Sequence, residues 1–270
     1  MEMIFGLDIG TRSIVGTVGY KNNANRFQIV SQVIKEHETR AMLDGQIHDI
    51  DAVSKTISEV KTKLEKAIGF PLKEVCIAAA GRVLKTVHVT AEHIFDSETV
   101  ITKEMVHSLD LLGVEQAYDT LKETENMELF RYYHVGYTVI KYYLNDYIML
   151  SLEGHKGSKI SADVLATFLP EEVIDGLYQA VEMAGLKVAN LTLEPIAAME
   201  VAIPENLRLL NLALVDVGAG TSDISITKDG SIIAFGMIPY AGDEITEYIA
   251  KKYLVDFNAA EKIKQGCLTK

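Results

Sequence analysis

One short pattern occurs twice in the sequence, first near the N-terminus and again beyond residue 210. In each copy an apolar run is followed by an aspartate, a glycine turn with hydroxyl side chains, and a second apolar run. The copies are Ile4–Val15, around Asp8-Ile9-Gly10-Thr11-Arg12, and Leu212–Ile224, around Asp216-Val217-Gly218-Ala219-Gly220-Thr221. Two such β-turn-β units predict two facing half-sites that close on one ligand. Carboxylates and glycine-lined backbone N–H groups suit a ligand made of a metal and phosphates.

Each copy taken alone has a simpler explanation. An Asp-x-Gly turn commonly closes a hairpin that binds nothing, so the first copy is weak evidence for a site. The second copy is stronger, because two glycines, two hydroxyls and the carboxylates of Asp216 and Asp223 fall within eight positions. A plain glycine turn stays an alternative for both copies.

A third acidic residue, Glu194, lies between the two copies, where a strand is predicted to pass into a helix. The C-terminal ends of strands in α/β sheets line ligand crevices. A carboxylate there can orient a water molecule for attack on a terminal phosphate. An acid near a helix N-terminus is also favoured by the helix dipole, and this alternative is the better one for Glu194 taken alone.

The composition excludes several classes of protein. Of 270 residues 48% are hydrophobic, which is ample for a buried core, and 38 acidic against 26 basic residues give a net charge of −12. Nucleic acid and anionic lipid are therefore not expected partners for the bulk of the chain. The two cysteines have no disulfide or metal-site spacing, and we recognise neither a signal peptide nor an apolar span of ~18 residues. We expect a cytoplasmic protein.

Alternating strand and helix patterns predict an α/β fold. The first helix is expected to have Asp51 as its N-cap and Gly69 as its stop, and Gly185 is expected to end a later helix. A hairpin turn is expected at 228–231. Strands are expected at 3–9, 13–20, 27–35, 74–80, 188–193, 209–217, 223–227 and 232–238, and helices at 51–68, 170–184, 195–202, 243–253 and 259–265.

The segment 83–165 has a different texture. A strand pattern at 84–91, a helix pattern at 102–122 and three β-rich runs at 132–143, 147–152 and 159–168 predict a compact α+β unit. We interpret this unit as an inserted subdomain. The first lobe then comprises 1–82 and 166–204, and 205–270 begins a second lobe.

The two Asp-Gly turns and Glu194 together resemble the actin-like ATPase superfamily, in which phosphate-1, connect-1 and phosphate-2 elements occur in this order. Downstream, Ile238-Pro239-Tyr240-Ala241-Gly242-Asp243 and Ala260-Glu261-Lys262-Ile263-Lys264 resemble the FtsA family of bacterial cell-division proteins. The PilM pilus-assembly family shares this arrangement. The resemblance implies an actin-like (ribonuclease H-like) α/β fold with a 1C-type subdomain. The second lobe is expected to be incomplete, because FtsA-like chains continue well past this point.

The resemblance implies ATP and Mg²⁺ as ligands. Asp8 and Asp216 would face the Mg²⁺ through water, and Glu194 would position a water molecule. Glu261 and Lys264 would contact the ribose and adenine, although a solvated ion pair is the alternative for residues one helical turn apart. A second lobe this short would cover adenosine poorly, so we expect weak nucleotide binding. The phosphates would lie between Gly10, Thr11 and Arg12 on one side and Gly218, Gly220 and Thr221 on the other.

The function implied by the resemblance is that of an ATP-binding adaptor that polymerises and links the FtsZ ring to the membrane, with slow or absent hydrolysis. PilM-type pilus assembly is a close alternative, and a small-molecule kinase or a chaperone ATPase of the same superfamily is a more distant one. The expected partners are further copies of the chain and FtsZ-like or other division or pilus proteins. Membrane contact at the inner face of the cell membrane is expected only through a C-terminal segment that this sequence lacks.

Overall fold

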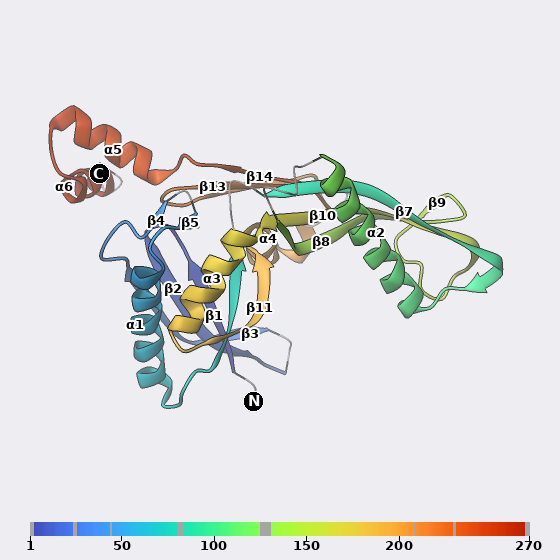
Figure 1. The fold of residues 1–270 in the computed structure, drawn as a ribbon, viewed down its shortest axis with the longest axis horizontal. Helices are drawn as coiled ribbons and strands as arrows, with labels where there is room; N and C mark the ends of the chain where they lie inside the picture. Colours follow the sequence, from blue (N-terminus) through green and yellow to red (C-terminus); the bar gives the residue numbers. More distant parts are fainter. Residues whose placement is uncertain are drawn as a thin grey trace.

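The computed structural model describes residues 3–23, 26–43, 45–79, 84–124, 131–207, 209–228 and 231–267. Within these residues the strands form sheets of five, four, three and two strands. Figure 1 shows an elongated arrangement, with the five-stranded sheet and its helices in the lower part and the four-stranded sheet extending to one side. The predicted α/β class is confirmed.

The five-stranded sheet carries the first aspartate turn between its strands β1 and β2. Its order is β11-β6-β1-β2-β3, in which β1 is antiparallel to β2 and parallel to β6. Helices α1 and α3 pack against each other and bury a core under the sheet. The strands are β1 (Ile4–Ile9), β2 (Ser13–Lys21), β3 (Phe27–Glu36), β6 (Glu74–Ala79) and β11 (Lys187–Leu193), the helices are α1 (Ile50–Ile68) and α3 (Glu171–Met183), and β4 (Met42–Leu43) and β5 (Gln46–Ile47) form a separate pair.

The N-cap of helix α1 lies two residues before the predicted one. The side chain of Asp49 accepts a hydrogen bond from the N–H of Ala52 at 2.9 Å, and Asp49 itself is extended. The predicted N-cap, Asp51, already lies in the first turn, so that prediction is wrong. The predicted stop is confirmed, because Gly69 adopts φ 84°, a left-handed conformation that glycine reaches without strain. The buried apolar face of α1 is formed by Val53, Ile57, Val60 and Leu64.

The four-stranded sheet follows the predicted order of strand, helix and three strands. Its strands are ordered β7-β10-β8-β9, and helix α2 packs on β7 and β10. The expected boundary at 82–83 lies outside the described residues, and the expected boundary at 165–166 falls inside the long strand β10. The elements are β7 (Lys85–Val100), α2 (Lys103–Thr124), β8 (Tyr132–Leu144), β9 (Tyr147–Met149) and β10 (Lys156–Pro170).

The three-stranded sheet carries the second aspartate turn, between β12 and β13. Its antiparallel order is β12-β13-β14, and it is preceded by α4 and followed by helices α5 and α6, which pack on each other. In Figure 1 the pair α5 and α6 lies at the far end from the four-stranded sheet. The elements are α4 (Glu194–Ala202), a short 3₁₀ helix (Glu205–Leu207), β12 (Ala213–Val217), β13 (Ser222–Lys228), β14 (Ser231–Ile238), α5 (Gly242–Tyr253) and α6 (Phe257–Gly266).

Two of the predicted features lie in this region, a strand at 209–217 and a hairpin turn at 228–231. The strand predicted at 209–217 begins only at Ala213, because the chain is still turning at Leu210, whose N–H donates to the carbonyl of Leu207 at 3.0 Å. The hairpin predicted at 228–231 agrees with the pairing of Lys228 with Ser231, while its two central residues lie outside the described part of the chain.

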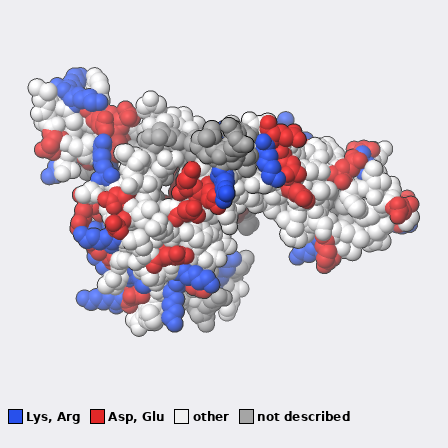
Figure 2. All heavy atoms as spheres, viewed as in Figure 1, with Lys and Arg blue, Asp and Glu red and all other residues white. Residues whose placement is uncertain are grey.

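The surface carries charges of both signs. On the face shown in Figure 2, acidic and basic side chains are interspersed over the body of the molecule. In the part of the chain that the structure describes, no helix combines the length and apolar character needed to cross a membrane.

Candidate functional site

The two aspartate turns have the same backbone geometry. In the first, the N–H of Gly10 donates to the carbonyl of Ser13 at 3.1 Å, and in the second the N–H of Gly218 donates to the carbonyl of Thr221 at 2.9 Å. The strand registers also match, since Asp8 pairs with Val15 across β1 and β2 as Asp216 pairs with Asp223 across β12 and β13. The predicted repeat of one β-turn-β unit is confirmed.

The structure brings the two turns into contact. A Cβ atom added to Gly220 would lie 2.8 Å from Cγ2 of Thr11, so a glycine is needed at this approach. The start of α5 also contacts the second turn. The N–H of Gly242 donates to the carbonyl of Gly218 at 3.1 Å, and the N–H of Asp243 donates to the carbonyl of Ala219 at 2.8 Å. The two turns therefore face each other, as predicted.

Four carboxylates gather beside these turns. They come from Asp8 on β1, Glu194 at the start of α4, Asp216 on β12 and Asp223 on β13. Burial is the largest cause that raises the pKa of Glu194 well above its ordinary value, and repulsion from the other three adds to it. Burial and the negative charge of Asp216 also raise the pKa of Asp8, and they raise the pKa of Asp223 to about 6.

This acidic cluster fits a hydrated cation. A cavity of about 10 Å³ lies between Glu194, Asp216 and Asp223, which is room for a single water molecule. Among the described residues, no three acidic, histidine or cysteine side chains are placed to enclose a metal ion directly. Mg²⁺ usually keeps several waters and takes few protein ligands. The oxygen-only donor set and the mutual repulsion of the carboxylates both favour such an ion.

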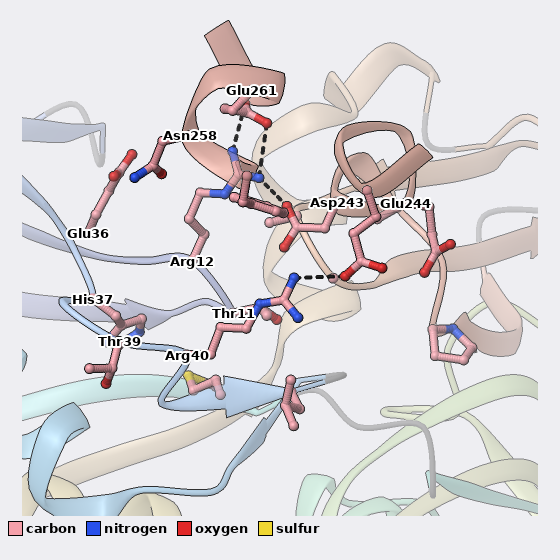
Figure 3. Close-up of a pocket in the computed structure, with 18 residues that line it drawn as sticks. Thr11, Arg12, Glu36, His37, Thr39, Arg40, Asp243, Glu244, Asn258 and Glu261 are labelled. Atoms are coloured by element: carbon pink, nitrogen blue, oxygen red, sulfur yellow. Dashed lines mark hydrogen bonds and ion pairs between the residues drawn. The ribbon is translucent and has the colours of Figure 1, made fainter. Parts of the chain in front are cut away.

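Arg12 links the first turn to the last two helices (Figure 3). Its guanidinium forms an ion pair with Asp243 on α5 and a second with Glu261 on α6, with 2.8 Å between Nη1 and Oε1. Glu261 also accepts hydrogen bonds from the hydroxyl of Thr246 at 2.6 Å and from Lys264 at 2.7 Å. Burial raises the pKa of Glu261, but these three partners outweigh it and lower that pKa to about 2.

A cavity of about 340 Å³ lies beside this network, between the segment after β3 and the helices α5 and α6. Arg40 reaches across it to Glu247, with an Nη2–Oε1 distance of 2.8 Å. Figure 3 labels Arg40 and draws this ion pair as a dashed line. The guanidinium carbons of Arg12 and Arg40 lie 5.6 and 5.2 Å from the ring centroid of Phe257, within the range of a cation–π interaction. Arg12, between β1 and β2, and Arg40, after β3, thus both contact the α5–α6 pair.

A family model described as type IV pilus assembly protein PilM matches residues 6–267. This chain belongs to the PilM family. Among curated relatives, the cell division protein FtsA of Pseudomonas aeruginosa is 25% identical over 97% of this chain, and FtsA of Escherichia coli K12 is 25% identical over 98%. FtsA of Bacillus subtilis is 22% identical over 98% of the chain. The chain spans 60%, 61% and 58% of these three relatives.

Solved structures show the same fold. A chain of the PilM–PilN type IV pilus biogenesis complex superposes with a TM-score of 0.69 at 16% identity, covering 97% of this chain and 69% of the other. The ethanolamine utilization protein EutJ from Carboxydothermus hydrogenoformans gives 0.56 at 19% identity, covering 98% and 62%. The predicted membership of the actin-like ATPase superfamily, in its FtsA- and PilM-like branch, is confirmed.

In this PilM-family chain the predicted site residues fall into three groups. The carboxylates Asp8, Glu194 and Asp216 lie in the acidic cluster, Gly10, Thr11, Gly218, Gly220 and Thr221 form the facing turns, and Arg12, Glu261 and Lys264 share one ion network. Their roles toward a ligand stay predictions.

Several residues of the site were given no role from the sequence. Asp223 and Asp243 stand inside the motifs that carried the resemblance, so the motif spacing was the signal that could have marked them. Arg40, Phe257 and His37 have no comparable signal. The partner of Arg40, for example, is 207 positions away along the chain.

Proposed function

We propose that this chain binds ATP with Mg²⁺ between its two aspartate turns. The observation that carries the proposal is the convergence of Asp8, Glu194, Asp216 and Asp223 beside two facing glycine turns. Like charges brought together in a half-buried place are costly unless a cation joins them. A nucleotide with its divalent ion brings that charge together with phosphate oxygens, to which the N–H groups of glycine turns can donate.

Each group of residues has a task in this proposal. Asp8 and Asp216 hold the ion through water, and Glu194 orients a water near the terminal phosphate. Bound Mg²⁺ supplies positive charge, which favours the ionised form of Glu194 and so allows that side chain to accept a proton. Arg12 keeps its two carboxylates and still has donors for a phosphate oxygen, because a guanidinium carries five N–H groups.

The wider role that we propose is assembly rather than rapid turnover. The family model favours pilus assembly of the PilM type, and the curated relatives favour a cell-division adaptor of the FtsA type that links an FtsZ ring to the membrane. Both roles use an actin-like fold that binds other copies of itself or partner proteins. A kinase of the same superfamily is a weaker alternative, and phosphorylation of any sugar or acid in a substrate panel would overturn the adaptor role.

The decisive experiment measures MgATP binding by calorimetry. We expect Asp216→Ala to weaken binding at least about tenfold, since loss of one charge-assisted contact costs about 1.5–3 kcal/mol. Asp175→Ala is the matched control, because Asp175 is an exposed aspartate on α3. Removal of Mg²⁺ should mimic Asp216→Ala. An affinity that is the same for the wild type and Asp216→Ala would contradict the site.

A further inference from the structure

His37 contacts the first aspartate turn twice. It follows directly after β3, and its backbone N–H donates to the carbonyl of Arg12 at 3.0 Å. The Nε2 atom of its ring lies 3.1 Å from the carbonyl oxygen of Gly10. One residue outside the turn therefore binds two carbonyls inside it. In Figure 3 His37 lies beside Thr39.

The other ring nitrogen faces helix α1. Nδ1 of His37 lies 3.3 Å from Oγ1 of Thr56, a hydroxyl that also donates to the carbonyl of Ala52 at 3.0 Å. Thr56 is buried, with 4% of its surface exposed. The imidazole thus bridges the rigid helix and the turn, and it has a polar neighbour at each nitrogen.

The two neighbours decide which nitrogen carries the proton. A carbonyl oxygen can only accept, so the contact with Gly10 requires a hydrogen on Nε2. The hydroxyl of Thr56 can turn its single hydrogen from the carbonyl of Ala52 to Nδ1, so Thr56 tolerates an unprotonated Nδ1. Burial lowers the pKa of His37, which keeps the ring neutral around pH 7. A neutral ring has one N–H, and Gly10 is the neighbour that needs it.

We propose that His37 is a positioning residue for nucleotide binding: its Nε2–H tautomer anchors the Gly10–Arg12 turn to α1 in the conformation that receives the phosphates. The role in nucleotide binding rests on the proposed function. The anchoring of the turn by His37 does not, because it can be tested in the chain without ligand. Gly10 has no side chain to restrict the turn, so the contacts from His37 add a restraint from outside it.

The first test is NMR of the chain with ¹⁵N-labelled histidine. We expect the ring signals that disappear in His37→Gln to show the Nε2–H tautomer at pH 7. A dominant Nδ1–H tautomer, or two tautomers in rapid exchange, would overturn the inference. This test needs no nucleotide.

The second test compares two substitutions of similar size. His37→Leu removes both ring nitrogens, whereas the side-chain amide of His37→Gln can still donate to Gly10. We expect His37→Leu to weaken MgATP binding about three- to tenfold, the range given by one hydrogen bond, and to speed amide hydrogen exchange at residues 10–12. His37→Gln should keep most of the MgATP affinity and most of the protection from hydrogen exchange. His88→Leu, at an exposed position on β7, is the control.

The outcomes separate the two proposals. If the wild type binds MgATP but His37→Leu binds equally well, or His37→Gln is no better than His37→Leu, the inference about His37 fails and the site stands. If the wild type binds no nucleotide, the proposed function fails. The tautomer and the hydrogen exchange then decide by themselves whether His37 anchors the turn.

Discussion

Arg12, between β1 and β2, forms ion pairs with residues of helices α5 and α6. Its partners Asp243 and Glu261 lie 231 and 249 positions away in sequence. The planar guanidinium can present separate N–H groups to two carboxylates, which a lysine ammonium on a flexible stem does less well. All three side chains are largely shielded from water, with 26%, 23% and 15% of their surfaces exposed. This geometry makes the ion pairs stronger than ordinary surface pairs.

We expect Arg12→Ala to lower the free energy of unfolding by about 2 kcal/mol, because two half-buried carboxylates lose a charged partner. Arg12→Lys should cost about 1 kcal/mol, since one ammonium replaces the fork. Urea unfolding followed by circular dichroism measures both. Arg26→Ala, at an exposed position before β3, should change the value by less than about 0.5 kcal/mol. Equal effects at Arg12 and Arg26 would show that the network does not stabilise the fold.

At the scale of single residues, the sequence predicted what local chemistry decides. Asp8 and Asp216 were chosen because each stands where a strand meets a glycine turn, and Glu194 because it follows a strand. The structure brings all three together. The cap of α1 was misassigned, because Asp49 and Asp51 are equally good cap residues and only the backbone conformation distinguishes them. His37 and Arg40 were missed because their roles depend on partners that only the folded chain brings near.

At the scale of elements, two glycines in helices show that the effect of replacing a glycine depends on what packs against it. Gly113 lies in α2 where that helix crosses β10, and an added Cβ would lie 2.6 Å from Cγ2 of Val164. Gly176 lies in α3, and an added Cβ there would have no neighbour within 4 Å. The same change should therefore have opposite effects at the two positions.

We expect Gly113→Ala to destabilise the fold by about 1–3 kcal/mol through overpacking. Gly176→Ala should stabilise it by up to about 1 kcal/mol, because alanine is the better helix former. Thermal unfolding of the two single variants under identical conditions is the measurement. Stabilisation by Gly113→Ala would contradict the close approach of α2 to β10.

Most elements were predicted because their hydrophobic period is local information. The amphipathic pattern of α1 and the glycine stops at Gly69 and Gly185 are examples that the structure confirms. Strand lengths were predicted less well. β7 extends to Val100, well beyond the predicted end at residue 91, because its pairing with β10 continues. A strand ends where its partner ends, and the partner is distant in sequence.

At the scale of the whole molecule, the two repeated units differ in what covers them. Leu7 and Ile9 on β1 are 3% and 4% exposed, whereas Val215 and Val217 on β12 are 53% and 63% exposed. The first strand has β2 on one side and β6 on the other, while in the described part of the chain β12 pairs with β13 alone. Two units with similar sequence patterns thus differ in how far the rest of the chain buries them.

The free energy of unfolding should depend on pH in opposite ways through the acidic cluster and through the Arg12 network. The pKa of Asp223 is raised from 3.8 to about 6 in the folded chain, so its contribution is present below pH 3.8 and lost as the pH rises through about 6. The pKa of Glu261 is lowered from 4.5 to about 2, so its contribution is present above pH 4.5 and lost as the pH falls through about 2.

We therefore expect these two groups to place the greatest stability near pH 4–5 in the absence of a bound cation. Asp223→Asn should flatten the decline on the neutral side, and Glu261→Gln should flatten the decline on the acid side. Urea unfolding measured across the pH range tests both variants against the wild type. A decline on the neutral side that Asp223→Asn leaves unchanged would show that this carboxylate is not coupled to folding.

The sequence by itself determined the fold class, the repeated aspartate turns and the carboxylates at the ends of their strands. These follow from side-chain period and turn chemistry, which act over a few residues. Only the tertiary structure decided that Arg12 pairs with α5 and α6, that Gly220 meets Thr11, and that His37, directly after β3, contacts the carbonyl of Gly10. The physical reason is that charge pairing and close packing depend on distance in space, and a single sequence records only distance along the chain.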